Sequence, residues 1–133
     1  MNISDILAIS GLPGLYRLVG NRANGLIVED LKSGKRKFVS SRKHQFSPME
    51  SISIYTLGDT VPLRDIFAKM RDQEATVPPV PPKSEQHVLF EYFEQILPDF
   101  DEDRVKVKDI KKIIQWYAHL KALDLLTDSD EEE

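Results

Sequence analysis

The densest group of chemically active side chains lies in residues 29–46, EDLKSGKRKFVSSRKHQF, where six Lys or Arg and one His accompany two acids. Clustered Lys and Arg attract polyanions, and small domains bind oligonucleotides or peptides through basic loops. The run makes binding of RNA or single-stranded DNA one hypothesis for this chain. The candidate contacts are Lys32, Lys35, Arg42 and Lys43, with Tyr16, Phe46 and Tyr55 as rings that suit base stacking or, equally, a hydrophobic core.

The same run also has an interpretation that needs no ligand. The residues around Gly34 are typical of a three-residue hairpin loop in which that glycine is left-handed. Such a loop places Asp30 opposite Arg36 and Glu29 opposite Lys37. Opposite charges paired across two strands contribute about 0.2–1 kcal/mol each, so part of the positive charge is balanced locally.

Motifs for metal binding or catalysis fail on detail. Residues 99–103, DFDED, resemble the start of a calcium-binding loop, but Arg104 stands where the loop needs Gly and Ile110 where it needs Glu. The chain has no Cys and three scattered His, and it contains no nucleophile elbow, phosphate-binding loop or HExxH motif. We therefore expect no metal, no cofactor and no enzyme activity.

Composition is that of an ordinary globular protein, with 41% hydrophobic and 30% charged residues in a chain of 133. No run approaches the roughly eighteen consecutive apolar residues that span a bilayer. The first residues, MNISDILAIS, lack the basic and long apolar regions of a signal peptide. We expect no membrane association and a cytoplasmic location, which the absence of Cys also fits.

The chain divides chemically at a proline-rich stretch, ATVPPVPP, residues 75–82. Residues 1–74 hold 11 Lys and Arg against 8 acids, whereas residues 75–133 hold 7 against 14. Four prolines favour extended polyproline II, so we predict a spacer between two domains; Pro78–Lys83 also matches a PxxPxK ligand pattern, which is the weaker interpretation. Residues 127–133 predict a solvated acidic tail.

The first part, residues 1–74, predicts a small SH3-like β-barrel with an appended helix. Residues 4–8 are expected to form one helical turn, and Asn24-Gly25 predicts a type I′ hairpin. Four or five short strands suit a strongly bent barrel; the apolar runs lie at 14–20, 26–31, 36–40, 43–46 and 51–56. A helix capped by Thr60 should follow, with a buried stripe of Leu63, Ile66, Phe67 and Met70.

The second part, residues 83–126, predicts a helical hairpin, so the fold class is α+β. A helix capped by Ser84 and stopped by Pro98 carries the apolar face Leu89, Phe93, Ile96 and Leu97. A helix over 108–123 carries Ile110, Ile113, Ile114, Tyr117 and Leu120. Because some forty residues bury little core alone, we expect the hairpin to pack on the helix of the first part or on a second copy.

With these segments placed, the chain resembles an uncharacterised family of Bacteroidetes proteins of unknown function. The residues that carry the resemblance are ILAISGLPGLYRL (6–18), NGLIVEDLKSGKR (24–36), ISIYT (52–56), VPLRDIFAKM (61–70) and VKVKDIKKIIQWY (105–117). The resemblance implies an N-terminal SH3-like barrel and a C-terminal helical domain. It implies no particular binding or catalytic residue.

The function that the sequence favours is that of a non-enzymatic binding or adaptor protein. The second part carries more large apolar residues than a small helical hairpin needs, and aromatic anchors dominate the energy of protein interfaces. We therefore predict contact with an unknown protein partner or self-association, and nucleic-acid binding is the alternative. The candidate interface residues are Phe100, Trp116, Leu125 and Leu126.

Overall fold

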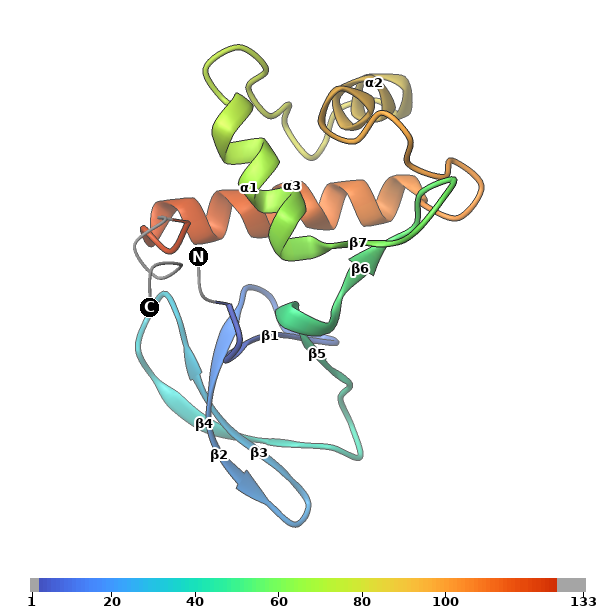
Figure 1. Ribbon diagram of the computed structural model, residues 1–133. Coiled ribbons are helices and arrows are strands. Elements are labelled where there is room, and N and C mark those ends of the chain that lie inside the picture. The colour runs from blue at the N-terminus through green and yellow to red at the C-terminus, as the bar shows by residue number, and fades with distance from the viewer. Residues whose placement is uncertain (1–2, 127–133) are drawn as a thin grey trace. The chain divides into compact units, whose positions relative to one another are not determined.

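The computed structural model describes residues 3–126 and divides the chain into two compact units, with the boundary between Ile52 and Ser53 (Figure 1). The N-terminal unit, residues 3–52, is called the sheet unit, and the C-terminal unit, residues 53–126, the helical unit. The predicted acidic tail, 127–133, lies outside the described residues.

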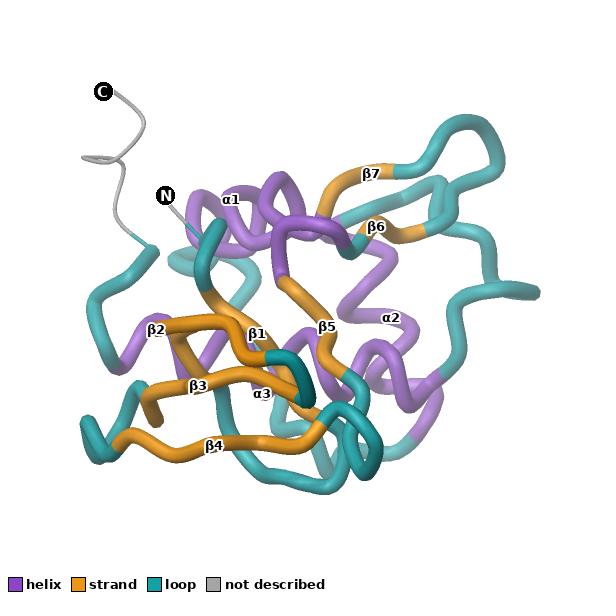
Figure 2. The backbone as a smooth tube through the Cα atoms, turned by 90° about the horizontal axis from the view of Figure 1, so that it is seen from below, coloured by secondary structure: helices purple, strands orange, loops and turns teal. Residues whose placement is uncertain are grey.

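The sheet unit is one antiparallel five-stranded sheet in the order β4-β3-β2-β1-β5 (Figures 1 and 2). Its elements are β1 (Ile6–Ile9), β2 (Tyr16–Arg22), β3 (Gly25–Asp30), β4 (Arg36–Ser40), β5 (Phe46–Pro48) and the 3-10 turn η1 (Met49–Ser51). The core of this unit is formed by Leu7, Ile9, Tyr16, Val28 and Val39. These side chains come from β1, β2, β3 and β4, so these four strands are held by burial as well as by their ladders.

The expected SH3-like barrel is not confirmed, because the described sheet is not closed into a barrel. β4 and β5 are its two edges and do not pair with each other. β5 has three residues and ends in Pro48, which has no N–H to donate. The α+β class stands, but closure depends on pairing between strands distant in the chain, which local patterns do not specify.

The N-terminal segment was also predicted wrongly, since residues Ile6–Ile9 form β1 rather than a helical turn. β1 lies between β2 and β5, and three of its four residues are buried. A short apolar run such as Ile-Leu-Ala-Ile fits a strand covered on both sides as well as it fits a turn of helix. Neighbouring strands decided between the two.

Two glycines shape the β2–β3 and β3–β4 connections. Arg22 pairs with Gly25, so Ala23 and Asn24 form the β2–β3 turn, and neither has a positive φ; the predicted type I′ turn is therefore wrong. Gly25 is needed for another reason: a Cβ there would collide with the carbonyl oxygen of Val39 on β4. Gly34, with φ +76°, has the left-handed conformation that was predicted.

The helical unit begins with a short hairpin and continues with three helices. Its elements are β6 (Ser53–Ile54), β7 (Val61–Pro62), α1 (Leu63–Gln73), α2 (Gln86–Ile96) and α3 (Val107–Ala122). All thirteen predicted stripe residues of the three helices are buried. Apolar residues at helical spacing predict burial reliably because they all lie on one face of the helix. The predicted cap at Thr60 is wrong: the chain is extended through β7, and Pro62 precedes the helix.

The boundary between units differs from the predicted one. α1 belongs with α2 and α3 and contacts α2, so the hairpin gains its additional core from α1. The proline-rich segment 75–82 therefore connects α1 with α2 inside the helical unit, where the sequence suggested a spacer between domains. It contains neither helix nor strand, as four prolines dictate.

Candidate functional site

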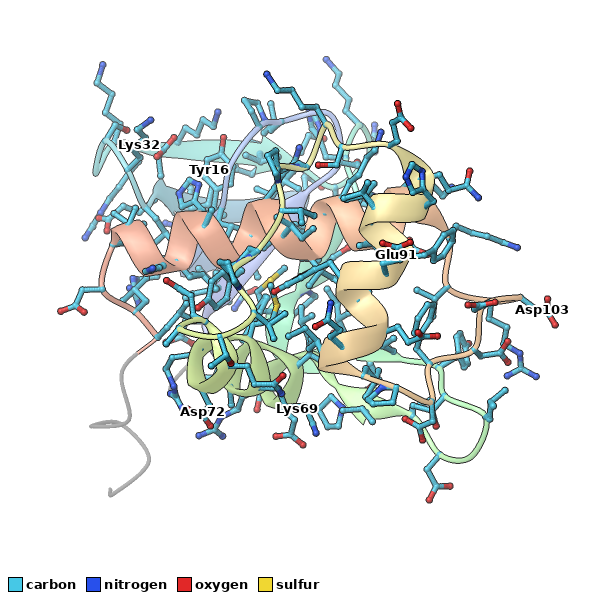
Figure 3. The ribbon with its side chains drawn as sticks, turned by 90° about the horizontal axis from the view of Figure 1, so that it is seen from above. Tyr16, Lys32, Lys69, Asp72, Glu91 and Asp103 are labelled. Carbon is cyan, nitrogen blue, oxygen red and sulfur yellow. The ribbon has the colours of Figure 1, made fainter. Side chains whose placement is uncertain are left out.

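The four predicted nucleic-acid contacts lie in two loops at opposite ends of one strand. Lys32 and Lys35 are exposed in the loop between β3 and β4, and Arg42 and Lys43 are exposed in the loop between β4 and β5. Figure 2 shows the path of β4 between the two loops, and Figure 3 shows the side chain of Lys32. Five strand residues at ~3.3 Å each separate the loops by roughly 16 Å or more. The structure therefore sets these cations in a line along β4 instead of gathering them into one patch.

The charge pairing across β3 and β4 is shifted by one residue from the prediction. Glu29 pairs with Arg36, and Arg36 Nε lies 3.1 Å from Glu29 Oε1. Lys37 lies across from Val28 and places its Nζ 5.2 Å from the centre of the Tyr16 ring. The predicted pairs Asp30–Arg36 and Glu29–Lys37 are wrong, although local balancing of Arg36 by an acid is observed.

The shift originates in the loop after Asp30. The Asp30 carboxylate accepts hydrogen bonds from the backbone N–H of Lys32 (2.7 Å) and Ser33 (3.1 Å), and Gly34 N–H donates to the Asp30 carbonyl at 2.8 Å. Asp30 N–H in turn donates to the carbonyl of Lys35. These bonds close a four-residue loop, 31–34, which is one residue longer than expected and moves every later pair by one.

Two of the three rings considered for base stacking pack in the core of the sheet unit. Tyr16 is buried in the sheet core, and Phe46 is half-buried against the same core. Tyr55 belongs to the helical unit. Phe38 on β4 carries an exposed ring, with 49% of its surface accessible. The sequence around Phe38 does not distinguish it from a core residue.

The predicted protein-interface residues are divided between core and surface. Phe100 is 4% exposed and packs on Phe90 (centroids 6.0 Å apart, nearly parallel) and Phe93 (5.0 Å, edge to face). Leu126 is also buried, and its carbonyl accepts a hydrogen bond from Arg71. Trp116 and Leu125 are half-buried. Phe100 and Leu126 thus support the helical unit itself.

An exposed apolar surface that sequence reasoning missed lies on the loop between β6 and β7. Leu57 is 79% exposed and Tyr55 is 46% exposed, whereas Thr56 between them is buried. An extended chain sends alternate side chains to opposite sides, so Tyr55 and Leu57 share the outward face. The signal in the sequence is small: an apolar residue directly before Gly58-Asp59, where a polar turn residue is usual.

The loop that carries these residues is firmly held. Leu57 N–H donates to the Asp99 carbonyl (2.9 Å), and Asp101 N–H donates to the Tyr55 carbonyl (3.0 Å). Inside the loop, the buried Thr56 hydroxyl donates to the Asp59 carbonyl and accepts from Gly58 N–H. The exposed side chains therefore stand on a backbone with little freedom left.

Arg104 completes this surface. Its guanidinium carbon lies 4.9 Å from the centre of the Tyr55 ring, and its Nε lies 3.6 Å from an Asp101 carboxylate oxygen. A guanidinium over an aromatic face is an attractive arrangement that also restricts the ring. We call Tyr55, Leu57 and Arg104 the Tyr55 surface.

A group of ionisable side chains joins the ends of α1 and α3. The Glu74 carboxylate accepts hydrogen bonds from Lys121 and from the Tyr117 hydroxyl, and these bonds hold the pKa of Glu74 below its usual value. Burial, followed by the charge of Glu74, raises the pKa of Tyr92, and burial with the bond to Glu74 raises that of Tyr117. With raised pKa values, both phenols keep their protons near neutral pH and are poor groups for proton transfer there. The group is therefore suited to holding the helices together.

Two of the hollows on the helical unit have several charged residues in their walls. One, of about 280 Å³, adjoins the Glu74 group, where Lys121 is already paired with Glu74. The other, of about 780 Å³, lies beside the first turn of α2 and the α2–α3 loop, and Glu91 and Asp103 at its wall are exposed (Figure 3). Its polar side chains all face solvent and Phe90 is half-buried, so it is an open depression.

The described residues, 3–126, contain neither a metal-binding cluster nor a membrane-spanning helix. No three His, Asp or Glu side chains in this range are arranged to hold a metal ion. Within the same residues, no helix combines the length and apolar character that crossing a bilayer requires.

The chain is thus a two-unit α+β protein with an open antiparallel sheet followed by a three-helix unit. Two family models match it: the Domain of unknown function (DUF6852) over residues 52–120, and the Domain of unknown function (DUF5606) over residues 3–49. The chain belongs to the DUF6852 family, and the two matched ranges meet close to the boundary between the units.

A solved structure agrees with this assignment. The solution NMR structure of a protein from Bacteroides vulgatus is 32% identical, covers 93% of this chain and 87% of that chain, and has a TM-score of 0.73. The expected resemblance to an uncharacterised Bacteroidetes family is confirmed at this level. No curated protein matches the chain.

Proposed function

We propose that this protein is a non-enzymatic binding protein whose Tyr55 surface docks a protein partner. The observation that carries the proposal is Leu57: a large apolar side chain, 79% exposed, on a loop fixed by backbone hydrogen bonds to residues 99–101. Exposure of one leucine is ordinary, but Leu57 is accompanied on the same face by an exposed Tyr and by Arg104. Tyr and Arg are the residue types most enriched among interface hot spots.

The energetics favour this surface as an anchor. Burying a leucine in a partner contributes about 1.5–3 kcal/mol, and a tyrosine adds a comparable amount. Because the loop is already ordered, little conformational entropy remains to be lost on binding. The fixed backbone therefore raises the net affinity that each buried side chain delivers.

The surroundings of the Tyr55 surface support a partner with basic residues. Acidic residues accompany it in both segments that build it, with Asp59 in the loop and Asp99, Glu102 and Asp103 exposed on the α2–α3 connection. A complementary partner offers an apolar pocket for Leu57 with Lys or Arg at its edge. We keep the cytoplasm as the proposed location, which the absence of Cys fits.

The test uses the full chain, tagged, in quantitative pull-downs from its native cells with nuclease added. We expect proteins retained by the wild type to be reduced at least tenfold by Leu57→Asp and by Tyr55→Ala. Val19→Ser, an exposed apolar position in the sheet unit, should change retention less than twofold. Equal retention by all variants would remove the proposal, and light scattering identifies a second copy as the partner if Leu57→Asp dissociates a dimer.

A further inference from the structure

A second binding surface is carried by the free edge of the sheet. We propose that β4 binds an extended acidic peptide segment of a partner protein as an added strand. In the described sheet β4 pairs with β3 alone, so its other edge presents backbone N–H and C=O groups to solvent. Residues 32–38 are all exposed, so no other described segment of the sheet unit lies over this part of the edge.

The distribution of charge along β4 suits an acidic ligand. The sheet unit has eight Lys and Arg against four acids. The two acids on β3 next to β4 are engaged: Glu29 pairs with Arg36, and the Asp30 carboxylate caps the loop. No ion pair within the described chain involves the loop cations; these are Lys32, Lys35, Arg42 and Lys43.

Both basic loops are held in place before any ligand arrives. The β3–β4 loop is closed by the bonds to the Asp30 carboxylate. The β4–β5 loop is tied to Ser10: His44 Nδ1 lies 2.7 Å from the Ser10 carbonyl oxygen, and Gln45 N–H donates to the Ser10 hydroxyl at 2.7 Å. The backbone that carries the cations is therefore fixed at both ends of β4.

The centre of the edge supplies an apolar anchor. Phe38 shares the outer face of the sheet with Arg36 and lies opposite Ile27, and at 49% exposure about half of its surface is open to a ligand. An added strand could pack one alternate side chain on this ring while its acidic ends reach the loops. From Lys35 to Arg42 the strand spans about seven residues at ~3.3 Å each, which sets the length of the bound segment at about seven residues.

A peptide fits these features better than nucleic acid does. The unpaired backbone groups of an edge strand are satisfied by another peptide backbone, whereas a phosphodiester chain has no N–H to donate. Single-stranded nucleic acid also requires several stacking rings, and Tyr16 and Phe46 are committed to the core. The two basic loops are too far apart for a compact oligonucleotide site. An extended peptide strand can reach both of them.

Fluorescence anisotropy of the full chain with a labelled synthetic heptapeptide, EDVYVDE, tests the proposal. We expect saturable binding that weakens with salt and falls at least tenfold in the double variant Lys35→Glu/Arg42→Glu. Lys69→Glu, an exposed charge reversal on α1, should change affinity less than twofold. The same peptide with its alternate backbone amides methylated should bind at least tenfold more weakly, because methylation removes strand hydrogen bonds.

Four results would each overturn the proposal. They are absence of binding at millimolar peptide, equal binding by the double variant, equal binding of the methylated peptide, and tighter binding of an oligouridylate that depends on the same two cations. A competitor peptide with the sequence of residues 127–133, TDSDEEE, tests whether the chain's own acidic segment occupies the edge. If it displaces the probe at lower concentration than unlabelled EDVYVDE, the segment bound is the chain's own and not a partner's. None of these results depends on the Tyr55 surface.

Discussion

The Tyr117 hydroxyl on α3 donates a hydrogen bond to the carboxylate of Glu74, the residue that caps the C-terminus of α1. Lys121, one helical turn further along α3, donates to the same carboxylate. One acid thus joins two helices through side chains that lie 43 and 47 positions from it in the chain. Because its partners are known, its contribution to stability can be measured.

Glu74→Gln should lower the free energy of unfolding by about 1 kcal/mol near pH 7, a value discounted for partial exposure of the pair. The pKa of Glu74 is lower in the folded chain, chiefly through Lys121 and then Tyr117. Such a group stabilises fully above its unfolded pKa of about 4.3, and the contribution is lost as pH falls through the folded pKa. The difference between wild type and variant should therefore shrink below about pH 4.

Urea unfolding at several pH values checks this prediction. Glu94→Gln is the matched control, since Glu94 is exposed on α2 and takes part in no hydrogen bond or ion pair with residues 3–126. A Glu74→Gln deficit that persists unchanged at acid pH would show that the charge of Glu74 is not responsible.

Tyr92→Phe and Tyr117→Phe should have different effects on stability. The Tyr92 hydroxyl is buried and has no hydrogen-bond partner among the described residues, so its removal should be neutral or stabilising by up to about 1 kcal/mol. Loss of the Tyr117 hydroxyl leaves Glu74 with one donor fewer and should destabilise by about 1 kcal/mol. Chemical denaturation of the two variants makes the comparison; a larger loss in Tyr92→Phe would contradict it.

Gly25→Ala should destabilise the sheet unit by roughly 3 kcal/mol or more, because the added methyl group overlaps the Val39 carbonyl oxygen and forces β3 and β4 apart. Gly20→Ala, also in a strand, meets its nearest neighbours at 3.6 and 4.0 Å and should be tolerated within about 1 kcal/mol. Thermal unfolding followed by circular dichroism distinguishes them. Equal tolerance at both positions would show that β4 lies further from Gly25.

The β3–β4 register predicts which charges are coupled. A double-mutant cycle between Glu29 and Arg36 should give a coupling free energy of about 0.2–1 kcal/mol, whereas a cycle between Glu29 and Lys37 should give a value near zero. Both cycles use alanine variants and urea unfolding. The reverse result would restore the three-residue loop that the sequence suggested.

Local features were predictable from the sequence because they depend on residues close together in the chain. The apolar stripes of α1, α2 and α3 are buried as expected, since helical spacing alone determines which side chains share a face. Gly34 is left-handed because a tight turn at that point needs a residue without Cβ. The proline-rich segment 75–82 is free of helix and strand for reasons equally local.

The tertiary structure decided everything that required knowing a distant neighbour. The Ile6–Ile9 run became a strand because β2 and β5 flank it, and the sheet stayed open because β4 and β5 do not pair. One additional residue in the loop after Asp30 shifted the charge pairing along β4. A strand's register and its place in a sheet are set by long-range contacts. Because side chains alternate along a strand, a register shift of one residue moves each side chain to the other face of the sheet.

The candidate sites follow the same division. Sequence alone identified the basic residues around β4, and the fold decided that they lie at two ends of an edge strand. Phe100 was recognisable as a large apolar residue, but packing against Phe90 and Phe93 placed it in the core. Leu57 was left outside because its loop is pinned to residues 99–101. Residue type sets what a side chain can do chemically, whereas its exposure depends on which distant segment packs against it.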